Sequence, residues 1–191
     1  SCFPVVGCVP YRGYYSKQLA DGYAAQFLEA GDDVVVGGVI AYSTLGFFDD
    51  PVTSTMLRLP EERLAGLIFH ELAHQVVYVK NNATFNESFA RAVEIEGTLR
   101  WLESRQDSAG LARYRAALER AETFFAAVSA ARAQLAMLYA SASGPAEKRS
   151  GKAQIIEAMR EAQRQRKTQD AGWAIYDSWF ADLNNAKLAA V

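Results

Sequence analysis

The chain contains only two histidines, which lie four residues apart with a glutamate directly after the first. His70, Glu71 and His74 form the pattern H-E-x-x-H. On an α-helix, residues four apart share one face, with Cβ atoms about 6 Å apart, so two imidazoles can bind one metal ion. The pattern is typical of zinc sites in which the glutamate acts as a base on water. We therefore expect His70 and His74 to bind one Zn²⁺ ion and Glu71 to be the general base.

A catalytic zinc site needs a third protein ligand and a position open to water or substrate. The chain has no third histidine, so we expect a carboxylate on a following helix. Glu87 is the first acidic residue after His74, and Glu94, on roughly the same helix face, is the alternative. Glu87 also completes a capping-box pattern that begins at Thr84, in which its carboxylate would bond to the start of the helix.

Hydrophobic periodicity predicts the helices that position these residues. Helices are expected over residues 16–30, 60–80, 84–104, 111–139 and 146–167. The two histidines lie in the second of them, which has Pro60 at its start and two glutamates in its first turn. Glu87 lies in the third, which we expect to pack back against the second.

Two strands are expected near the N-terminus, over residues 3–9 and over the β-branched run Val34–Tyr42. We therefore predict an α+β fold: a small N-terminal sheet (strand-helix-strand) packed on the active-site helix, followed by a mostly helical C-terminal body. A single domain is expected over residues 1–191, with the sheet region at 1–59, the active-site helices at 60–104 and a helical region at 105–191.

Composition and charge exclude some classes of protein. The 191 residues are 50% hydrophobic with a net charge of −2, which supports a packed core and argues against a nucleic-acid binder. The longest apolar runs fall well short of the roughly 18 residues of a transmembrane helix, and no signal peptide is recognisable. Cys2 and Cys8 are expected to be buried and unpaired, unless Pro4 and Gly7 fold the segment back so that they form a disulfide.

A peptide substrate would need further groups around the metal. An edge strand at Val34–Tyr42 would pair with the peptide backbone. A tyrosine is expected to stabilise the oxyanion, and the candidates, which the sequence does not rank, are Tyr42, Tyr78 and Tyr176. An aminopeptidase also needs a carboxylate for the free α-amine, and the candidates are Asp49, Asp50 and Glu94.

Several stretches resemble the bacterial family of putative aminopeptidases, gluzincin-like zinc metallopeptidases often described as envelope lipoproteins. These stretches are residues 2–9, 41–51, 67–75, 85–90 and 176–186. The resemblance spans nearly the whole chain and implies that His70, His74 and Glu87 are the ligands and Glu71 the base. It also implies a cell-envelope location and a longer precursor that carries a lipid-attachment cysteine, of which this chain would be a fragment.

The sequence is compatible with three functions. The first is a zinc metallopeptidase that acts on peptides from the amino end, which we favour because a purely structural zinc site has no need for Glu71 as a base. The second is a zinc-binding module that does not hydrolyse peptides. The third is a helical scaffold or partner-binding protein that uses residues 111–167. The sequence predicts neither peptide specificity nor oligomeric state.

Overall fold

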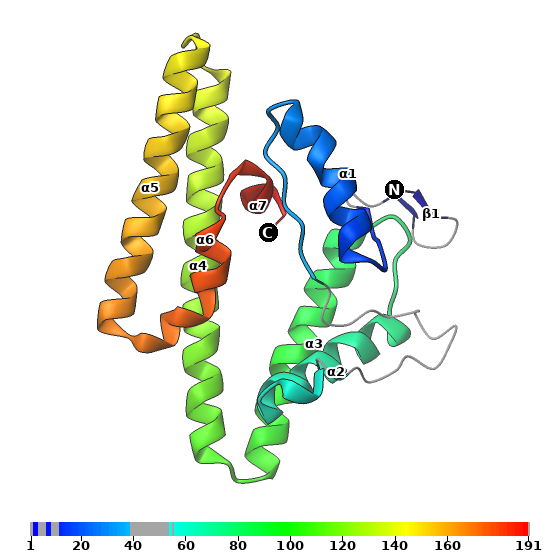
Figure 1. Cartoon of the computed structure of the whole chain (residues 1–191). Helices are drawn as coiled ribbons and strands as arrows, with labels where there is room; N and C mark the ends of the chain where they lie inside the picture. The colour runs from blue at the N-terminus through cyan, green and yellow to red at the C-terminus, as the bar shows by residue number, and fades with distance from the viewer. Residues whose placement is uncertain (1, 4–6, 9–11, 39–53, 55, 191) are drawn as a thin grey trace. The chain divides into compact units, whose positions relative to one another are not determined.

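The computed structural model describes residues 2–3, 7–8, 12–38, 54 and 56–190, and helices make up most of them (Figure 1). The chain divides into two compact units. The first consists of residues 1–15 and 37–115, and the second of residues 16–36 and 116–191.

The first unit is built on two antiparallel helices, α2 (Glu61–Val76) and α3 (Ala83–Ser104), which contact each other extensively (Figure 1). A short 3₁₀ helix, η1 (Met56–Arg58), precedes them. Helix α2 ends before the expected residue 80, because its C-cap, Val77, is extended with φ −135° and ψ 118°. The connection between the two helices therefore leaves α2 as an extended segment and then turns at residues 80–81, where the Asn82 N–H donates to the Val79 carbonyl at 3.2 Å.

Helix α3 is capped by Asn82, whose side chain accepts a hydrogen bond from the N–H of Phe85 at 3.1 Å. The expected cap was Thr84, with Glu87 as its capping-box partner. Because the helix begins two residues earlier than a cap at Thr84 would require, Glu87 lies beyond the first turn and its carboxylate is not used at the helix start.

Small residues let α2 and α3 approach closely. Ala73 and Ala90 are almost completely buried. A Cβ atom on Gly66 would lie 3.0 Å from Thr98 Oγ1, so α3 passes directly over this glycine. This close packing fixes the register of the two helices, and the register decides which side chains meet across the contact.

Replacing Gly97 by alanine should destabilise the protein by roughly 1–3 kcal/mol, because the new Cβ would lie 2.9 Å from Cγ and Cδ2 of the Phe69 ring. The matched control is Gly22→Ala in α1 (Lys17–Glu29), where nothing lies within 4 Å of the new Cβ and alanine should stabilise by about 0.5–1 kcal/mol. Urea denaturation of both variants measures the difference. Equal stabilisation by both would show that α2 and α3 are not packed this closely.

The second unit contains most of the remaining helices. These are α1, the part of α4 (Ser108–Ala140) from residue 116 onward, α5 (Pro145–Gln169), η2 (Ala171–Tyr176), α6 (Asp177–Ala181) and α7 (Asn185–Ala189). Helix α5 has Pro145 at its first position, and the N–H of Gly144 donates to the Glu147 carboxylate at 3.0 Å. The long helices predicted over 111–139 and 146–167 are therefore present, with ends that differ by a few residues.

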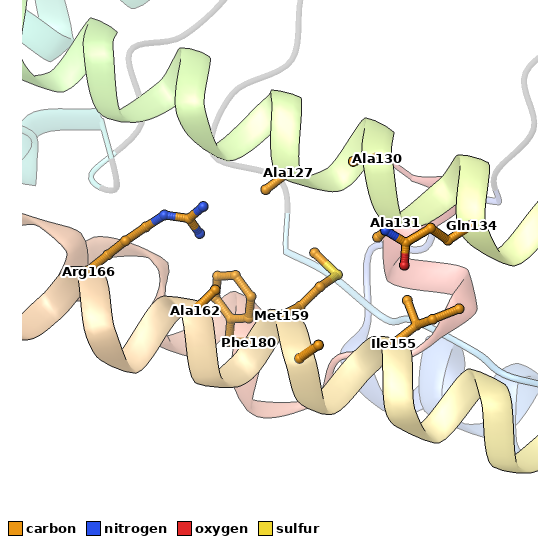
Figure 2. Close-up of a pocket in the computed structure, with 10 residues that line it drawn as sticks. Ala127, Ala130, Ala131, Gln134, Ile155, Met159, Ala162, Arg166 and Phe180 are labelled. Atoms are coloured by element: carbon orange, nitrogen blue, oxygen red, sulfur yellow. The ribbon is translucent and has the colours of Figure 1, made fainter.

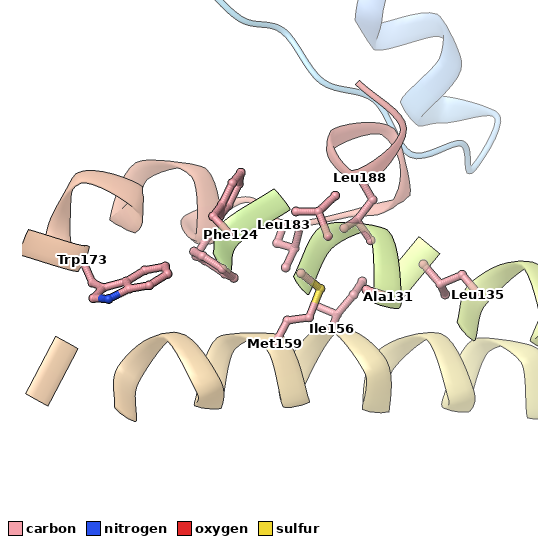
Figure 3. Packing of buried hydrophobic residues seen from close by; sticks show 10 residues of the cluster. Phe124, Ala131, Leu135, Ile156, Met159, Trp173, Leu183 and Leu188 are labelled. Atoms are coloured by element: carbon pink, nitrogen blue, oxygen red, sulfur yellow. The ribbon is translucent and has the colours of Figure 1, made fainter. Parts of the chain in front are cut away.

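The core of the second unit lies where α4, α5 and the C-terminal helices meet (Figure 3). Phe124 is its aromatic centre: its ring stacks on Tyr176 at 4.3 Å and meets Trp179 edge-on at 4.8 Å between centroids. Val128 and Leu188 are among its most deeply buried members, each 1% exposed. The C-terminal aromatic segment therefore serves as part of a hydrophobic core.

A pocket opens between α4 and α5, and alanine side chains make up half of the residues that line it (Figure 2). These residues are Ala127, Ala130, Ala131, Ala158 and Ala162. Gln134 and Arg166 are its polar residues, and the lining includes no histidine, cysteine or carboxylate. The pocket therefore has no groups that could bind zinc.

The α+β prediction is wrong, because the described residues form a helical protein without the expected strand-helix-strand sheet. Residues 34–38 of the second predicted strand form no strand, and residues 39–42 lie outside the described part of the chain. The Val34 carbonyl instead accepts a hydrogen bond from Asn184 Nδ2 at 2.9 Å. β-branched residues favour a strand only where a neighbouring strand can pair with them, and here a side chain occupies that position.

The first predicted strand is replaced by a backbone pairing of two residues on each side. Cys2–Phe3 (β1) pairs antiparallel with Gly7–Cys8 (β2), so Cys2 lies opposite Cys8 and Phe3 opposite Gly7. This pairing replaces the single strand predicted over residues 3–9 and agrees with the alternative in which Pro4 and Gly7 fold the segment back. Within the described residues, no helix is both long enough and apolar enough to cross a membrane.

Candidate metal centre

Both histidines project from α2 toward α3. The centroids of the His70 and His74 rings lie 4.9 Å apart, with their planes at 82° to each other. This arrangement follows from the helix itself, because residues four apart are neighbours on one face. The side chain of His74 is 9% exposed and that of His70 is 20% exposed. The pair is therefore held largely within the contact between the two helices.

Glu87 of α3 meets both imidazoles. Its Oε2 lies 3.3 Å from His70 Nε2, and its Oε1 lies 3.7 Å from His74 Nε2. Four ligand atoms at about 2.0–2.1 Å from a tetrahedral zinc ion lie roughly 3.3–3.5 Å from one another. One ligand atom from each of the three residues falls within a group no more than 4.8 Å across. The donor types and separations thus fit a metal ion of this kind, and this group could hold one.

The centre is buried on the histidine side and open on the carboxylate side, where the Glu87 side chain is 66% exposed. Nδ1 of His74 is buried and has no hydrogen-bond partner among the described residues. A catalytic zinc site needs such an open side, because water and substrate must reach the ion. A structural zinc site, by contrast, is closed by four protein ligands.

Glu94 lies on the opposite edge of the His70 ring from Glu87. Its Oε2 is 3.2 Å from His70 Nδ1, and its Oε1 pairs with Arg91. A carboxylate in this position favours a proton on Nδ1 and leaves Nε2 directed toward Glu87. Glu94 was the alternative to Glu87 as ligand, but the structure places it outside the group of converging donors.

The His70–Glu94 pair makes the stability of the metal-free protein depend on pH. The hydrogen bond to Glu94 raises the pKa of His70 above 6.5, although burial opposes this. Burial raises the pKa of Glu94, but His70 and Arg91 outweigh it and hold that pKa below 4.5. The pair therefore stabilises the folded state most strongly between these two pKa values.

We expect the free energy of unfolding of metal-free protein to fall as pH rises through the raised pKa of His70. It should also fall as pH drops through the lowered pKa of Glu94. Denaturant unfolding in the presence of a chelator, from about pH 3 to about pH 9, measures both losses. Glu94→Gln should flatten the pH dependence at both ends, and an unchanged profile in this variant would contradict the pairing.

Glu71 follows His70 on α2 and is partly buried. Its negative charge contributes to the raised pKa of His70, although less than Glu94 and Glu87 do. Glu71 is therefore the residue next to a candidate ligand on the same helix.

The remaining predicted residues are distributed differently. Tyr78 lies in the connection after α2, in the same unit as the centre, and its side chain is partly exposed. Tyr176 belongs to the second unit, where its ring stacks on Phe124. Tyr42, Asp49 and Asp50 lie outside the described residues.

Sequence reasoning missed the role of Asn86. Its side chain is 2% exposed, accepts a hydrogen bond from the Val79 N–H at 2.8 Å and donates one to the Val79 carbonyl at 2.9 Å. In the sequence, Asn86 is part of the stretch 85–90 that resembles the aminopeptidase family and begins a possible glycosylation sequon, and neither pattern predicts this contact. A polar residue with no charge and no catalytic spacing gives no signal that it will be buried.

A family model described as "Putative aminopeptidase" matches residues 1–191. The chain belongs to this family. No curated protein and no solved structure matches it significantly. For this aminopeptidase family member, the family description points to a peptidase and a peptide substrate, and the side chains that could hold a metal are those of His70, His74 and Glu87.

Proposed function

We propose that the protein is a zinc-dependent metallopeptidase that removes residues from the amino end of peptides. The observation that carries this proposal is that His70, His74 and Glu87 bring their ligand atoms together, and Glu71 follows His70 on α2. Two neutral imidazoles and one carboxylate are a ligand set that zinc enzymes use. Membership of the aminopeptidase family supports the reaction type.

In this proposal His70, His74 and Glu87 hold the ion, and Glu94 keeps the His70 ring in the required tautomer through Nδ1. Zinc bound there supplies a Lewis acid that acidifies water and polarises a carbonyl. A carboxylate oxygen of Glu71 takes a proton from the water that attacks the scissile carbonyl carbon. The same carboxylate then delivers the proton to the nitrogen of the leaving amine as the C–N bond breaks.

A peptide digest tests the reaction and its direction. Protein stripped with a chelator and then restored with one equivalent of zinc is incubated with peptides that carry either a free or an acetylated amino terminus. We expect zinc-restored protein to release the first residue of the free peptides and to leave the acetylated ones intact. Bound zinc without any cleavage would instead favour a zinc-binding module, and cleavage of acetylated peptides would indicate an endopeptidase.

A further inference from the structure

Asn86 is one of four polar or charged side chains that are buried among the described residues. Both ends of its amide bond to one backbone residue, since Oδ1 accepts from the Val79 N–H and Nδ2 donates to the Val79 carbonyl. Asn86 lies on α3, whereas Val79 lies in the extended connection that leaves α2. The side chain thus joins the start of one helix to the segment that follows the other.

The two residues that form this clamp, Val79 and Asn86, lie between two of the candidate ligands along the chain. His74 is in the last turn of α2, and Glu87 directly follows Asn86 on α3. The ion-pair contacts found for the Glu87 carboxylate within the described residues are those to the two histidines, and its side chain is 66% exposed. The position of this carboxylate therefore depends mainly on where the first turns of α3 are held.

We propose that Asn86 is a positioning residue that holds Glu87 within reach of both imidazoles. The proposal rests on the proposed zinc site. Without the two bonds to Val79, the start of α3 can shift relative to the end of α2, and a misplacement of about 1 Å is enough to impair a metal site. The Asn82 side chain, by contrast, accepts a hydrogen bond from the Phe85 N–H at the start of its own helix. The backbone N–H of Asn82 also donates to the Val79 carbonyl at 3.2 Å, and this bond is independent of the Asn86 side chain.

The test uses two substitutions. Asn86→Ala removes both hydrogen bonds, whereas Asn86→Asp keeps the size of the side chain and the acceptor for the Val79 N–H but directs a second oxygen at the Val79 carbonyl. The control is Val128→Ala in the core of the second unit, which lowers stability without touching α2 or α3. Three quantities are measured: the melting temperature without metal, the zinc dissociation constant by chelator competition, and the visible spectrum of the Co²⁺-loaded protein.

We expect both Asn86 variants to bind zinc about 10–100-fold more weakly than wild type, with an altered cobalt spectrum. Val128→Ala should lower the melting temperature and change neither metal readout. If wild type binds zinc and either folded Asn86 variant binds it within threefold, with the same cobalt spectrum, the clamp is only structural and the inference is wrong. If wild type itself binds no zinc, the proposed metal site is wrong and this inference falls with it.

Discussion

Replacing Glu71 by glutamine lowers kcat for peptide hydrolysis by roughly 10²–10⁴-fold while zinc stays bound. Glutamine has nearly the same size and can still form hydrogen bonds, but it cannot accept the proton of the attacking water. The three proposed ligands are untouched, so the zinc dissociation constant should remain close to that of wild type. Initial rates on a free-amino peptide, together with metal analysis of the same sample, measure both quantities.

The control for this experiment is Glu61→Gln, the same change at the first residue of α2. Glu61 is 76% exposed and its contact with Arg105 is 3.5 Å, so the substitution should leave activity unchanged. If Glu71→Gln kept more than a tenth of the wild-type kcat, another group would have to be the base. If it lost zinc as well as activity, Glu71 would belong to the group that binds the metal.

Replacing Glu87 by glutamine should weaken zinc binding by more than about 100-fold, which exceeds the 10–100-fold typical of a residue that only orients a ligand. The amide keeps an oxygen near both imidazoles but loses the negative charge that favours a divalent cation. Because the Glu87 side chain is 66% exposed, the free energy of unfolding without metal should change by less than about 0.5 kcal/mol. Competition with a chromophoric chelator measures the affinity.

Two further variants on α3 serve as comparisons for Glu87→Gln. Glu94→Gln, which removes the charge beside His70 Nδ1, should weaken zinc binding by about 10–100-fold. Glu96→Gln, at a 60% exposed position that pairs with Arg100, should have no effect. If Glu94→Gln were the more damaging of the two site variants, Glu94 rather than Glu87 would be the third ligand.

The parts of the site that sequence could predict are those set by a single helix. His70 and His74 had to share a face once residues 60–80 were predicted to be helical, and the structure places their rings 4.9 Å apart. The prediction of Glu87 as the third ligand required one further assumption, that α3 packs back antiparallel on α2. Its carboxylate lies 3.3 Å from His70, so this assumption agrees with the structure.

The features that sequence could not predict depend on contacts between elements. Glycine is unfavourable inside a helix, and the sequence alone gives no reason for Gly66 and Gly97. The structure gives one, because Thr98 and Phe69 leave little room for a Cβ atom at these positions. Thr84 matches the pattern of a helix cap as well as Asn82 does, and the extended connection after Val76 decided between them. The run at Val34 resembles a strand, but its carbonyl bonds to Asn184, 150 residues later in the chain.

All of these expectations depend on one divalent cation that binds between His70, His74 and Glu87. A crystal grown with zinc, with diffraction data collected just above and just below the zinc absorption edge, tests this directly. We expect an anomalous peak at about 2.0–2.2 Å from Nε2 of both histidines and from a Glu87 carboxylate oxygen, and this peak should disappear below the edge. A map without a peak there, from crystals in which these three side chains are well ordered, would contradict it.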